Sequence, residues 1–533
     1  MAEYPTPVAA RELHVISSPR PGEGHVIPEE IQAVSPVTGE VIARYAPASE
    51  EEVRRAVERG RAAFAGWSVT PIPERVRLLG RLRGLLVQGI DEHVARIAAA
   101  TGKPHVEALA GDLLTCVDFI RYHEAHAAEH LAPEPRPGGL LFGLSKFHVE
   151  YSPIGVVAVF SPWNYPLQLA LIPTVTALAA GNTVVLKPSE ITPTVGELIG
   201  GLCREAGFPA DVVQIVQGGP AVGRALIAAR PDKIFFTGSV ATGREVMRAA
   251  AEQLIPLELE LGGKDPMIVF ADANLERAVR GAVYGAFANA GQACVSVERL
   301  YVERPIYERF VQRAAEEAAK LRVGSGLEAD IGPIISAAQL DKIEAHLADA
   351  VERGARVVGQ KRVDGRRFHP LVLRDADHTM RVMREETFGP LLPVMPFDGE
   401  EQAVTLANDS DYGLSGSVWT RDLERGRRVA GRLVCGSCAV NDVIKNISNP
   451  HVPFGGERQS GFGRYHGPEG LRAFSRVRSV MVSGGMLPRE INWFPYGRAA
   501  YNALKLLIQA GYGEGGAGAR VKGILESMLG MIK

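Results

Sequence analysis

A glutamate and a cysteine near the middle of the chain have the residue types that covalent thiol chemistry needs. Glu260 stands in Glu-Leu-Gly-Gly-Lys (260–264), and Cys294 follows thirty-four residues later in Gly-Gln-Ala-Cys (291–294). Both lie close to glycine, which lets a backbone approach a ligand where a Cβ would block it. A thiolate can attack a carbonyl while a carboxylate activates water. Because most single cysteines are small buried hydrophobes, the pair alone leaves both a catalytic and a packing interpretation open.

Five further motifs occur in a fixed order around this pair. They are Phe-Ser-Pro-Trp-Asn-Tyr-Pro (160–166), Asn-Thr-Val-Val-Leu-Lys-Pro-Ser-Glu (182–190), Phe-Thr-Gly-Ser-Val-Ala-Thr-Gly (236–243), Glu-Glu-Thr-Phe-Gly-Pro (385–390) and Pro-Phe-Gly-Gly (453–456). In this order and spacing the set closely resembles the NAD(P)-dependent aldehyde dehydrogenase superfamily over residues 30 to 482. Some features are similar to its fatty and aromatic aldehyde branch.

The resemblance implies a reaction and three catalytic residues. Cys294 would attack an aldehyde, and the oxyanion would accept hydrogen bonds from the Asn164 side-chain amide and the Cys294 backbone N–H. Hydride transfer to the nicotinamide would leave a thioester, and Glu260 would activate the water that releases the acid. Glu258 would share a face with Glu260 on a regular strand, so periodicity does not choose between them. The choice of Glu260 rests on its match to the family motif.

The cofactor expectation begins at Gly238 and Ser239, which follow a predicted strand and precede a predicted helix. Unpaired N–H groups and the helix dipole at such a turn favour a phosphate. Lys187 and Glu190 follow another strand, where ribose recognition is expected. The resemblance favours NAD and leaves NADP plausible. It implies further cofactor contacts at Trp163, Gly262, Glu386 and Phe388, and no metal site is expected.

Length and composition limit the class of protein. A chain of 533 residues predicts two or three domains, and 46% apolar with 23% charged residues are values of a globular protein. A formal net charge of −2 gives no electrostatic case for nucleic acid. Five cysteines in so long a chain fit a reducing compartment rather than a disulfide framework. With no signal peptide evident at the N-terminus, a cytoplasmic location is expected.

Alternating strand and helix patterns predict the α/β class. The alternation runs from residue 154 to 262, with strands at 183–187 and 233–236 among others, and again from 263 to 445, which implies parallel sheets covered by helices. Ser49-x-x-Glu52 predicts a capping box that opens a first helix. Two or three more helices are predicted from 72 to about 131, as a cover with no part in the chemistry. The resemblance specifies two doubly wound α/β domains plus a small β oligomerisation element. The expected parts are an N-terminal arm (1–30), an NAD(P)-binding domain (31–139 and 158–261), an oligomerisation hairpin and strand (140–157 and 471–485), a catalytic domain (262–470) and a C-terminal helical extension (486–533).

The substrate and the tail leave alternatives open. The apolar stretch 165–172 favours an apolar aldehyde, whereas the residues after Cys294 look more like branches for small aldehydes or semialdehydes. An acylating enzyme using coenzyme A, or a non-catalytic binding protein on the same scaffold, are further alternatives. The extension at 486–533, with helices predicted at 499–510 and 521–532, could cover the substrate tunnel, contact a membrane surface or pack on a neighbouring subunit. The oligomerisation hairpin implies a homodimer or homotetramer.

Overall fold

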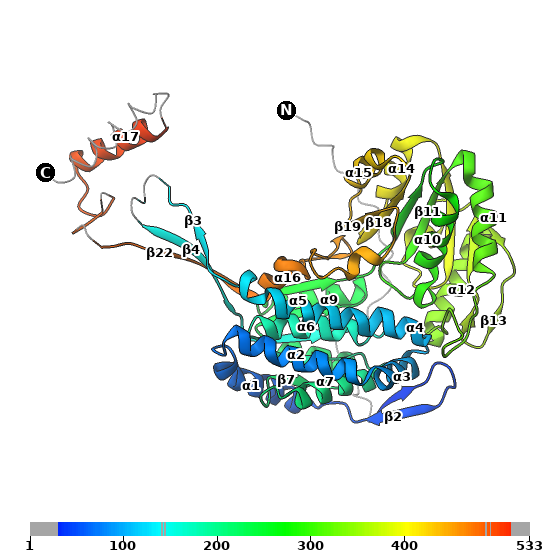
Figure 1. Ribbon diagram of the computed structural model, residues 1–533, viewed down its shortest axis with the longest axis horizontal. Helices are drawn as coiled ribbons and strands as arrows, with labels where there is room; N and C mark the ends of the chain where they lie inside the picture. Colours follow the sequence, from blue (N-terminus) through cyan, green and yellow to red (C-terminus); the bar gives the residue numbers. More distant parts are fainter. Residues whose placement is uncertain (1–29, 140–141, 143–144, 486–487, 491, 513–533) are drawn as a thin grey trace.

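The computed structural model describes most of the chain in one arrangement. The described residues are 30–139, 142, 145–485, 488–490 and 492–512. The expected N-terminal arm, apart from its last residue, and the last helix expected near 521–532 lie outside them. Figure 1 shows two helix-covered sheets and a narrow sheet that extends away from the body.

The first sheet has six strands in the order β21-β9-β8-β5-β6-β7. Five of them run parallel: β5 (Val156–Phe160), β6 (Thr183–Lys187), β7 (Val213–Ile215), β8 (Lys233–Thr237) and β9 (Leu257–Glu260). The connecting helices are α6 (Gln168–Ala179), α7 (Pro193–Ala206), α8 (Pro220–Ala228) and α9 (Val240–Ala251). Every residue of β5, β6 and β8 is buried. Burial on both faces is why these strands read as continuous apolar runs rather than as alternating ones.

A group of helices from the first part of the chain covers this sheet (Figure 1). They are α1 (Glu50–Trp67), α2 (Ile72–Gln88), α3 (Ile90–Thr101), the short α4 (His105–Glu107), the π-helix η1 (Ala108–Leu114) and α5 (Thr115–His130). The predicted capping box at the start of α1 is present, with Ser49 accepting from the Glu52 N–H and Glu52 accepting from the Ser49 N–H. A two-stranded sheet, β1 (Ile31–Val34) and β2 (Val41–Tyr45), precedes them.

The second sheet has seven strands in the order β12-β15-β16-β11-β10-β18-β19. They are β10 (Asp265–Val269), β11 (Val297–Glu303), β12 (Arg356–Val358), β15 (Leu371–Arg374), β16 (Leu391–Phe397), β18 (Ser415–Trp419) and β19 (Ser437–Val440). Only β12 runs antiparallel to its neighbour. The helices here include α10 (Leu275–Phe287), α11 (Tyr307–Ala318), α12 (Ala337–Glu352), α13 (Arg381–Arg384), α14 (Gly399–Asn408) and α15 (Leu423–Ala430).

The narrow sheet joins β22 (Ser475–Val482), β4 (Lys146–Pro153) and β3 (Glu134–Arg136) in an antiparallel arrangement. An oligomerisation hairpin and strand were expected at 140–157 and 471–485, but β3 forms from residues before 140 that were expected to belong to the NAD(P)-binding domain. Pro135 has no backbone N–H, and an edge strand tolerates this. The tail helix α17 (Arg498–Tyr512) lies beyond this sheet, away from the body (Figure 1).

One strand belongs to a different sheet from the one expected from its place in the chain. The antiparallel edge strand β21 (Gly461–Phe462) pairs with β9 of the first sheet, although residues 262–470 were expected to belong with the second. The physical reason is the free edge of β9, whose backbone groups gain hydrogen bonds from this pairing. A Cβ at Gly461 would lie 1.9 Å from the Leu259 carbonyl oxygen, so the close approach requires glycine.

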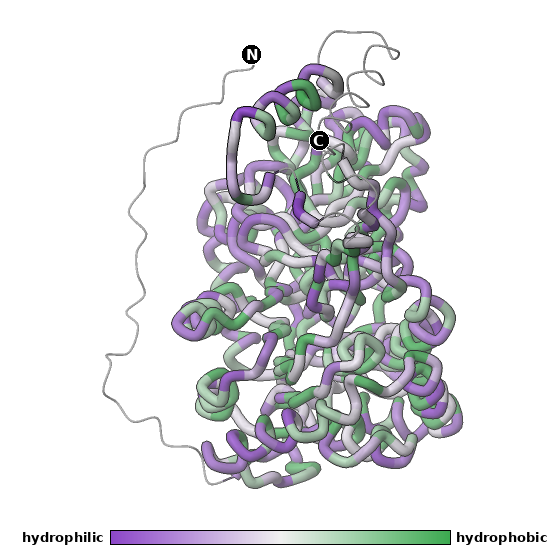
Figure 2. Tube along the Cα trace, turned by 90° about the vertical axis from the view of Figure 1, so that its left-hand side faces the viewer, coloured by the Kyte–Doolittle hydropathy of each residue, from purple (hydrophilic) through white to green (hydrophobic). Residues whose placement is uncertain are grey.

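Hydrophobic residues lie mainly inside the protein, as the predicted α/β architecture requires. Figure 2 shows hydrophobic stretches concentrated along interior parts of the trace and hydrophilic stretches around its outside. The α/β prediction is confirmed by the two mainly parallel, helix-covered sheets. Among the described helices, none is long and apolar enough to cross a membrane.

Candidate active site

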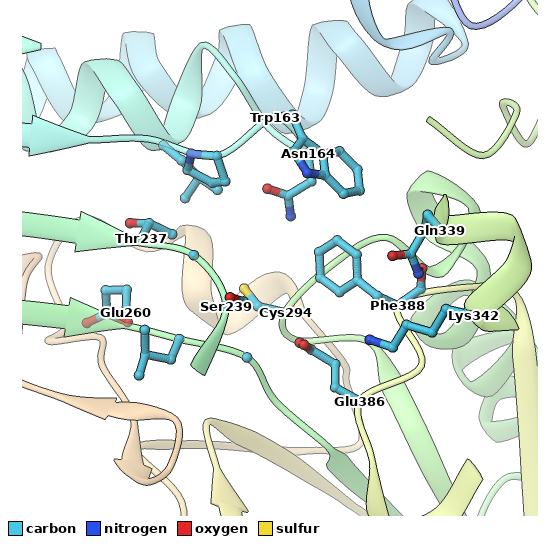
Figure 3. A pocket seen from close by; sticks show the side chains of 15 residues that line it. Trp163, Asn164, Thr237, Ser239, Glu260, Cys294, Gln339, Lys342, Glu386 and Phe388 are labelled. Carbon is cyan, nitrogen blue, oxygen red and sulfur yellow. The ribbon is translucent and has the colours of Figure 1, made fainter. Parts of the chain in front are cut away.

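A cavity of about 210 Å³ lies between the two large sheets and collects most of the residues singled out from the sequence. Figure 3 shows their side chains arranged around it. The first sheet and its loops contribute Pro162, Trp163, Asn164, Leu169, Thr237, Gly238, Ser239, Glu260, Leu261 and Gly262. The second contributes Cys294, Gln339, Lys342, Glu386 and Phe388. The expected nucleophile, carboxylate and amide therefore share one space.

Cys294 follows a tight 3₁₀ turn, η3 (Ala288–Gly291), and precedes β11. Within this turn Asn289 and Ala290 have left-handed backbone angles, with φ of +51° and +57°. Burial, followed by the charges of Asp265 and Glu386, raises the pKa of the Cys294 thiol above its ordinary range. The thiolate expected from the sequence therefore requires positive charge beyond what these residues supply.

Asn164 lies in the loop between β5 and α6 and is buried. Its Nδ2 donates to the Gln292 carbonyl at 3.1 Å, two residues before Cys294. Because an amide nitrogen carries two hydrogens, one remains for another acceptor. The Asn289 side chain donates in turn to the Asn164 carbonyl at 3.0 Å. These bonds tie the amide-bearing loop to the cysteine-bearing turn.

The structure gives different surroundings to Glu258 and Glu260, which periodicity could not distinguish. Glu258 forms a buried ion pair with Lys233, at 3.0 Å between Nζ and Oε1. Glu260 ends β9 in the cavity, and neither of its buried carboxylate oxygens has a hydrogen-bond partner among the described residues. Burial, with a smaller contribution from the Glu258 charge, raises the pKa of Glu260 well above its ordinary value. A buried carboxylate with raised pKa and free oxygens is suited to accept a proton.

Gly238 and Ser239 lie at the turn from β8 to α9, as the sequence predicted. The Ser239 hydroxyl caps α9 by accepting from the Thr242 N–H at 3.2 Å. The preceding Thr237 hydroxyl lines the cavity and is buried without a partner among the described residues. Backbone N–H groups at a helix start, together with a free hydroxyl, provide donors for a phosphate-containing ligand.

Glu386 and Phe388 reach the cavity from the segment after α13. Glu386 accepts from the Gly263 N–H at 3.1 Å, and burial raises its pKa to about 7. A Cβ at Gly262 would lie 2.5 Å from the Glu386 carboxylate oxygens, so this approach needs glycine. The Phe388 ring meets the Trp163 ring edge-on, with 5.5 Å between centroids.

Lys187 and Glu190 are the two predicted cofactor residues that do not line this cavity. They follow β6, with 3.5 Å between Lys187 Nζ and Glu190 Oε2. Lys187 Nζ also donates to the Gly218 carbonyl at 2.6 Å. Their position at the carboxyl end of β6, a parallel strand in the same sheet as β8, fits a neighbouring subsite of an extended ligand.

Three polar lining residues were given no role from the sequence: Thr237, Gln339 and Lys342. Gln339 Nε2 donates to the carbonyls of Thr387 and Phe388, both at 2.9 Å. Thr237 adjoins a recognised motif and could have been found by following its strand to the end. Gln339 and Lys342 lie on α12, an ordinary amphipathic helix whose sequence carries no comparable motif.

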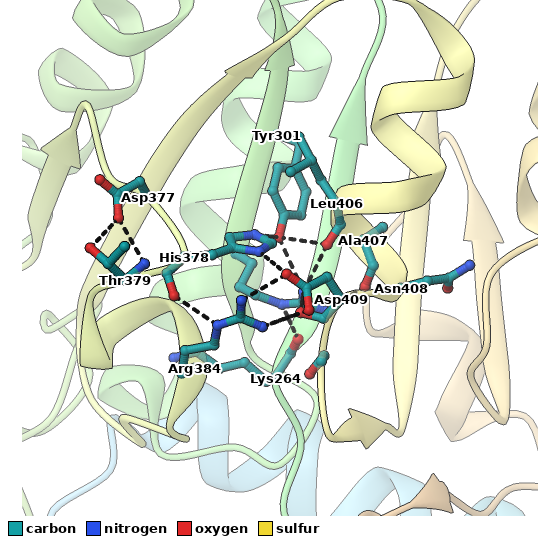
Figure 4. Close-up of polar contacts among 12 residues, drawn as sticks. Lys264, Tyr301, Asp377, His378, Thr379, Arg384, Leu406, Ala407, Asn408 and Asp409 are labelled. Atoms are coloured by element: carbon teal, nitrogen blue, oxygen red, sulfur yellow. Dashed lines mark hydrogen bonds and ion pairs between the residues drawn. The ribbon is translucent and has the colours of Figure 1, made fainter. Parts of the chain in front are cut away.

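Buried polar contacts fix the segment that carries Glu386 and Phe388. Glu298 accepts from the N–H groups of Thr387 and Phe388 at 2.7 and 2.8 Å. Figure 4 shows a second set just before that segment, where His378 lies between the Tyr301 hydroxyl (2.8 Å) and Asp409 (2.6 Å). Both sets connect this segment to the second sheet, which restricts where Glu386 can lie.

No group of three or more His, Cys, Asp or Glu side chains within the described ranges is placed to hold a metal ion.

Known proteins are similar to this chain in sequence and in architecture. The aldehyde dehydrogenase family model matches residues 25–480. A 4,4'-diapolycopene aldehyde oxidase from Methylomonas is 45% identical over 485 residues, which cover 91% of this chain and 92% of that protein. Among solved structures, Staphylococcus aureus betaine aldehyde dehydrogenase in complex with NAD+ has a TM-score of 0.83 at 32% identity, covering 88% of this chain and 94% of that one. A Mycobacterium tuberculosis aldehyde dehydrogenase complexed with NAD+ has a TM-score of 0.82 at 36% identity, covering 87% and 96%. The chain belongs to the aldehyde dehydrogenase family.

Proposed function

We propose that this enzyme oxidises an apolar aldehyde to the carboxylic acid, with NAD+ as the preferred oxidant and NADP+ as a possible second one. The observation that carries the proposal is the single cavity in which Cys294, Asn164 and Glu260 meet Gly238, Glu386 and Phe388. A nucleophile, an oxyanion donor and a base are thus placed beside the elements expected to hold a dinucleotide.

Each catalytic residue has a step that its surroundings support. The Cys294 sulfur forms a bond to the aldehyde carbon, and the oxyanion accepts from the second Asn164 amide hydrogen and the Cys294 N–H. After hydride loss leaves a thioester on Cys294, Glu260 takes a proton from water as the water attacks the acyl carbon. The C–S bond then breaks, releasing the acid and the thiol. Glu260 suits this step because its oxygens have no hydrogen-bond partner in the described part of the chain, whereas Glu258 is paired with Lys233.

The residues present fit a nicotinamide dinucleotide. When bound, the cofactor accepts the hydride, and its cationic ring favours the Cys294 thiolate. Gly238, Ser239 and the Thr237 hydroxyl, which has no partner within the described ranges, would meet the phosphates. Lys187 and Glu190 would meet the adenosine ribose. Gly262, Glu386, Phe388 and Trp163 would surround the nicotinamide end. A carboxylate at Glu190 accepts from ribose hydroxyls and repels a 2′-phosphate, which favours NAD+ over NADP+.

The surroundings of Cys294 support an apolar substrate. Cys294, Ile444 and Ile447 pack against a buried apolar cluster that includes Leu113, Ile172 and Phe454. Leu169 joins the cavity itself. The relative from Methylomonas, named for a carotenoid aldehyde, points to the same chemistry. A small aldehyde or semialdehyde remains the alternative substrate class, and an acylating reaction with coenzyme A is less well supported because Glu260 is present.

The deciding measurement is NADH production followed by absorbance. Aldehydes from acetaldehyde to hexadecanal would be compared with benzaldehyde and succinic semialdehyde, alongside Cys294→Ala. We expect turnover that depends on Cys294 and a kcat/KM that rises with chain length. Turnover on succinic semialdehyde alone would contradict the substrate class while keeping the reaction. No turnover with either NAD+ or NADP+ would refute the proposal and favour a non-catalytic binding protein.

We also propose that the protein is at least a homodimer built through the β3–β4–β22 sheet. This sheet extends from the body (Figure 1), and three of its apolar side chains are at least half exposed: Val477 at 62%, Met481 at 50% and Val482 at 52%. Apolar side chains on a projecting antiparallel sheet are stabilised when a second copy covers them. Size-exclusion chromatography with light scattering distinguishes a monomer, a dimer and a tetramer.

We propose that the C-terminal extension contacts an anionic membrane surface. Trp493, Phe494 and Tyr496 are exposed ahead of α17, and no described residue of the extension lines the cavity of its own subunit. Residues 486–533 contain six basic and three acidic side chains. Exposed aromatic residues with excess positive charge suit a lipid headgroup region. The full chain should co-sediment with phosphatidylserine vesicles and a chain lacking 486–533 should not; loss of the oligomer instead would show that the extension packs on a neighbouring subunit.

A further inference from the structure

The turn that carries the nucleophile is strained and needs outside support. Asn289 and Ala290 are consecutive left-handed residues, and neither is glycine. Asparagine tolerates this conformation better than most residues, but alanine has no side chain that could compensate for it. Such a turn persists when surrounding groups hold it in place. The groups that hold it therefore determine where Cys294 lies.

One of these groups is a carboxylate from a distant part of the chain. Glu107, at the end of α4, accepts a hydrogen bond from the Asn289 backbone N–H through Oε1. Its other oxygen, Oε2, is buried without a partner among the described residues. The bond connects the helices that cover the first sheet to the turn that leads into the second sheet. The sequence suggested only a helical cover for this region, with no part in the chemistry.

The same segment also holds the loop that carries Asn164. Five residues after Glu107, Asp112 accepts from the N–H groups of Leu167 and Gln168, both at 3.1 Å, at the start of α6. Lys103 pairs with Asp112 at 2.7 Å and lies 3.6 Å above the Tyr165 ring centroid. Residues 103–112 thus contact both sides of the reacting centre, the Asn164 loop through Asp112 and the Cys294 turn through Glu107.

The turn transmits this support to the catalytic groups through side-chain amides. Asn289 Nδ2 donates to the carbonyls of Asn164 (3.0 Å) and Gln292 (3.2 Å), and Asn164 Nδ2 donates to that same Gln292 carbonyl. Gln292 is itself held by the Ile335 N–H, which donates to Oε1 at 2.9 Å. A shift of Asn289 would therefore move the oxyanion donor and the nucleophile relative to each other.

We propose that Glu107 is a positioning residue for the aldehyde dehydrogenase reaction, holding the Asn289–Ala290 turn so that Cys294 and Asn164 keep their mutual geometry. The inference rests on the proposed function. A carboxylate is suited to this task because its hydrogen bond to an N–H is stronger when it is ionised. Glu107 acts through the turn and does not itself touch the reacting atoms.

The pH range in which this support changes follows from the surroundings of Glu107. Burial raises the pKa of Glu107 to about 7, and the Lys103 charge opposes the rise. The groups facing it are Lys103 and Asp112 from its own segment, Tyr165 from the loop before α6 and Tyr284 from α10. Burial raises the pKa of both tyrosines, so they keep their protons between pH 6 and 8. Glu107 therefore gains its charge, and its strongest hold on Asn289, as pH rises through about 7.

The test compares Glu107→Ala and Glu107→Gln with Asp118→Asn, an exposed carboxylate on the adjoining α5. Steady-state kcat and KM are measured from pH 6 to 8. In addition, the rate at which iodoacetamide alkylates Cys294 is followed by peptide mass spectrometry, with the partly exposed Cys435 as an internal reference. Alkylation needs no turnover, so it tests the positioning role even if the aldehyde substrate has been misassigned.

We expect Glu107→Ala to lose tenfold or more in kcat with KM changed less than threefold, and Cys294 to be alkylated at least threefold more slowly with Cys435 unaffected. Glu107→Gln keeps an acceptor but resembles the protonated carboxyl, so its kcat should fall below wild type at pH 8 and match it at pH 6. Asp118→Asn should match wild type throughout. Unchanged kcat and alkylation in Glu107→Ala would overturn the proposal, as would equal changes at Cys294 and Cys435. If Glu107→Ala does not fold, a Glu107→Gln to wild-type ratio that stays constant with pH would overturn it.

Discussion

Glu260→Gln should separate the two halves of the reaction. The substitution preserves the shape of a side chain whose oxygens have no partner among the described residues, so the fold should tolerate it. Glutamine cannot take a proton from water, and removing a general base costs about 10²- to 10⁴-fold. At about 1.4 kcal/mol per tenfold, this is a barrier increase of about 3 to 5 kcal/mol on thioester hydrolysis alone.

Rapid-mixing absorbance at the NADH wavelength provides the assay. Attack by Cys294 and hydride transfer do not require Glu260 as a base in this scheme, so NADH should form in a burst approaching one equivalent per subunit. Steady turnover should then continue at the reduced rate. Acid quenching of the reaction followed by intact mass spectrometry should find the acyl group on Cys294.

Glu258→Gln is the matched control, because it removes a carboxylate two residues away on the same strand. It leaves the Lys233 ammonium buried without its partner, and breaking a buried ion pair costs about 3–5 kcal/mol of stability. We expect a lower melting temperature but turnover per folded molecule within fivefold of wild type. A Glu260→Gln enzyme without a burst, or with wild-type steady turnover, would refute the assignment of Glu260 to hydrolysis. A Glu258→Gln enzyme that showed the burst instead would reverse the two roles.

Three further outcomes follow from the contacts of the site. Asn164→Ala should lose about 10²- to 10³-fold in kcat with little change in KM, because it removes an oxyanion donor. Glu260→Gln should melt at a higher temperature than wild type, and the difference should widen from pH 5 to pH 8. Because burial raises the pKa of Glu260, the folded wild-type protein loses stability as pH rises above 4.5, the ordinary pKa of a glutamate, and the glutamine variant does not. Asp409→Asn should lower the melting temperature at neutral pH, and the difference should shrink as pH falls below 3.8, because the Arg384 guanidinium holds the pKa of Asp409 below that value. Differential scanning fluorimetry across pH checks the last two, and unchanged pH profiles would contradict both.

The sequence predicted most of what local patterns encode. Strands at 183–187 and 233–236, the capping box at Ser49 and the turn at Gly238 were placed correctly, because each depends on residues that are neighbours in the chain. Family membership was likewise readable from motifs, and the comparisons confirm it. The tail helix was predicted at 499–510 and observed at Arg498–Tyr512.

Contacts between residues far apart in the chain could not be predicted from local sequence patterns. Gln339 and Lys342 reach the cavity because α12 packs beside the segment that carries Phe388, and no local sequence pattern predicts that placement. The role proposed for Glu107 depends on a hydrogen bond to Asn289, which is 182 residues away in the chain. The region around Glu107 was expected to be a plain helical cover because helix periodicity reports which face is buried and not what a buried carboxylate meets.

The two glutamates of β9 show what the sequence determines and what only the tertiary structure determines. The sequence by itself determined that Glu258 and Glu260 lie on one strand beside a glycine turn, since alternation and turn residues are local properties. Periodicity could not distinguish them, because residues two apart on a strand share a face; the choice of Glu260 came from its match to the family motif. Tertiary structure gives them different surroundings: Lys233, from the neighbouring strand β8, pairs with Glu258, while the oxygens of Glu260 lie in the cavity without a partner among the described residues. Strand pairing sets which charge lies beside which carboxylate, and that pairing exists only once the chain has folded.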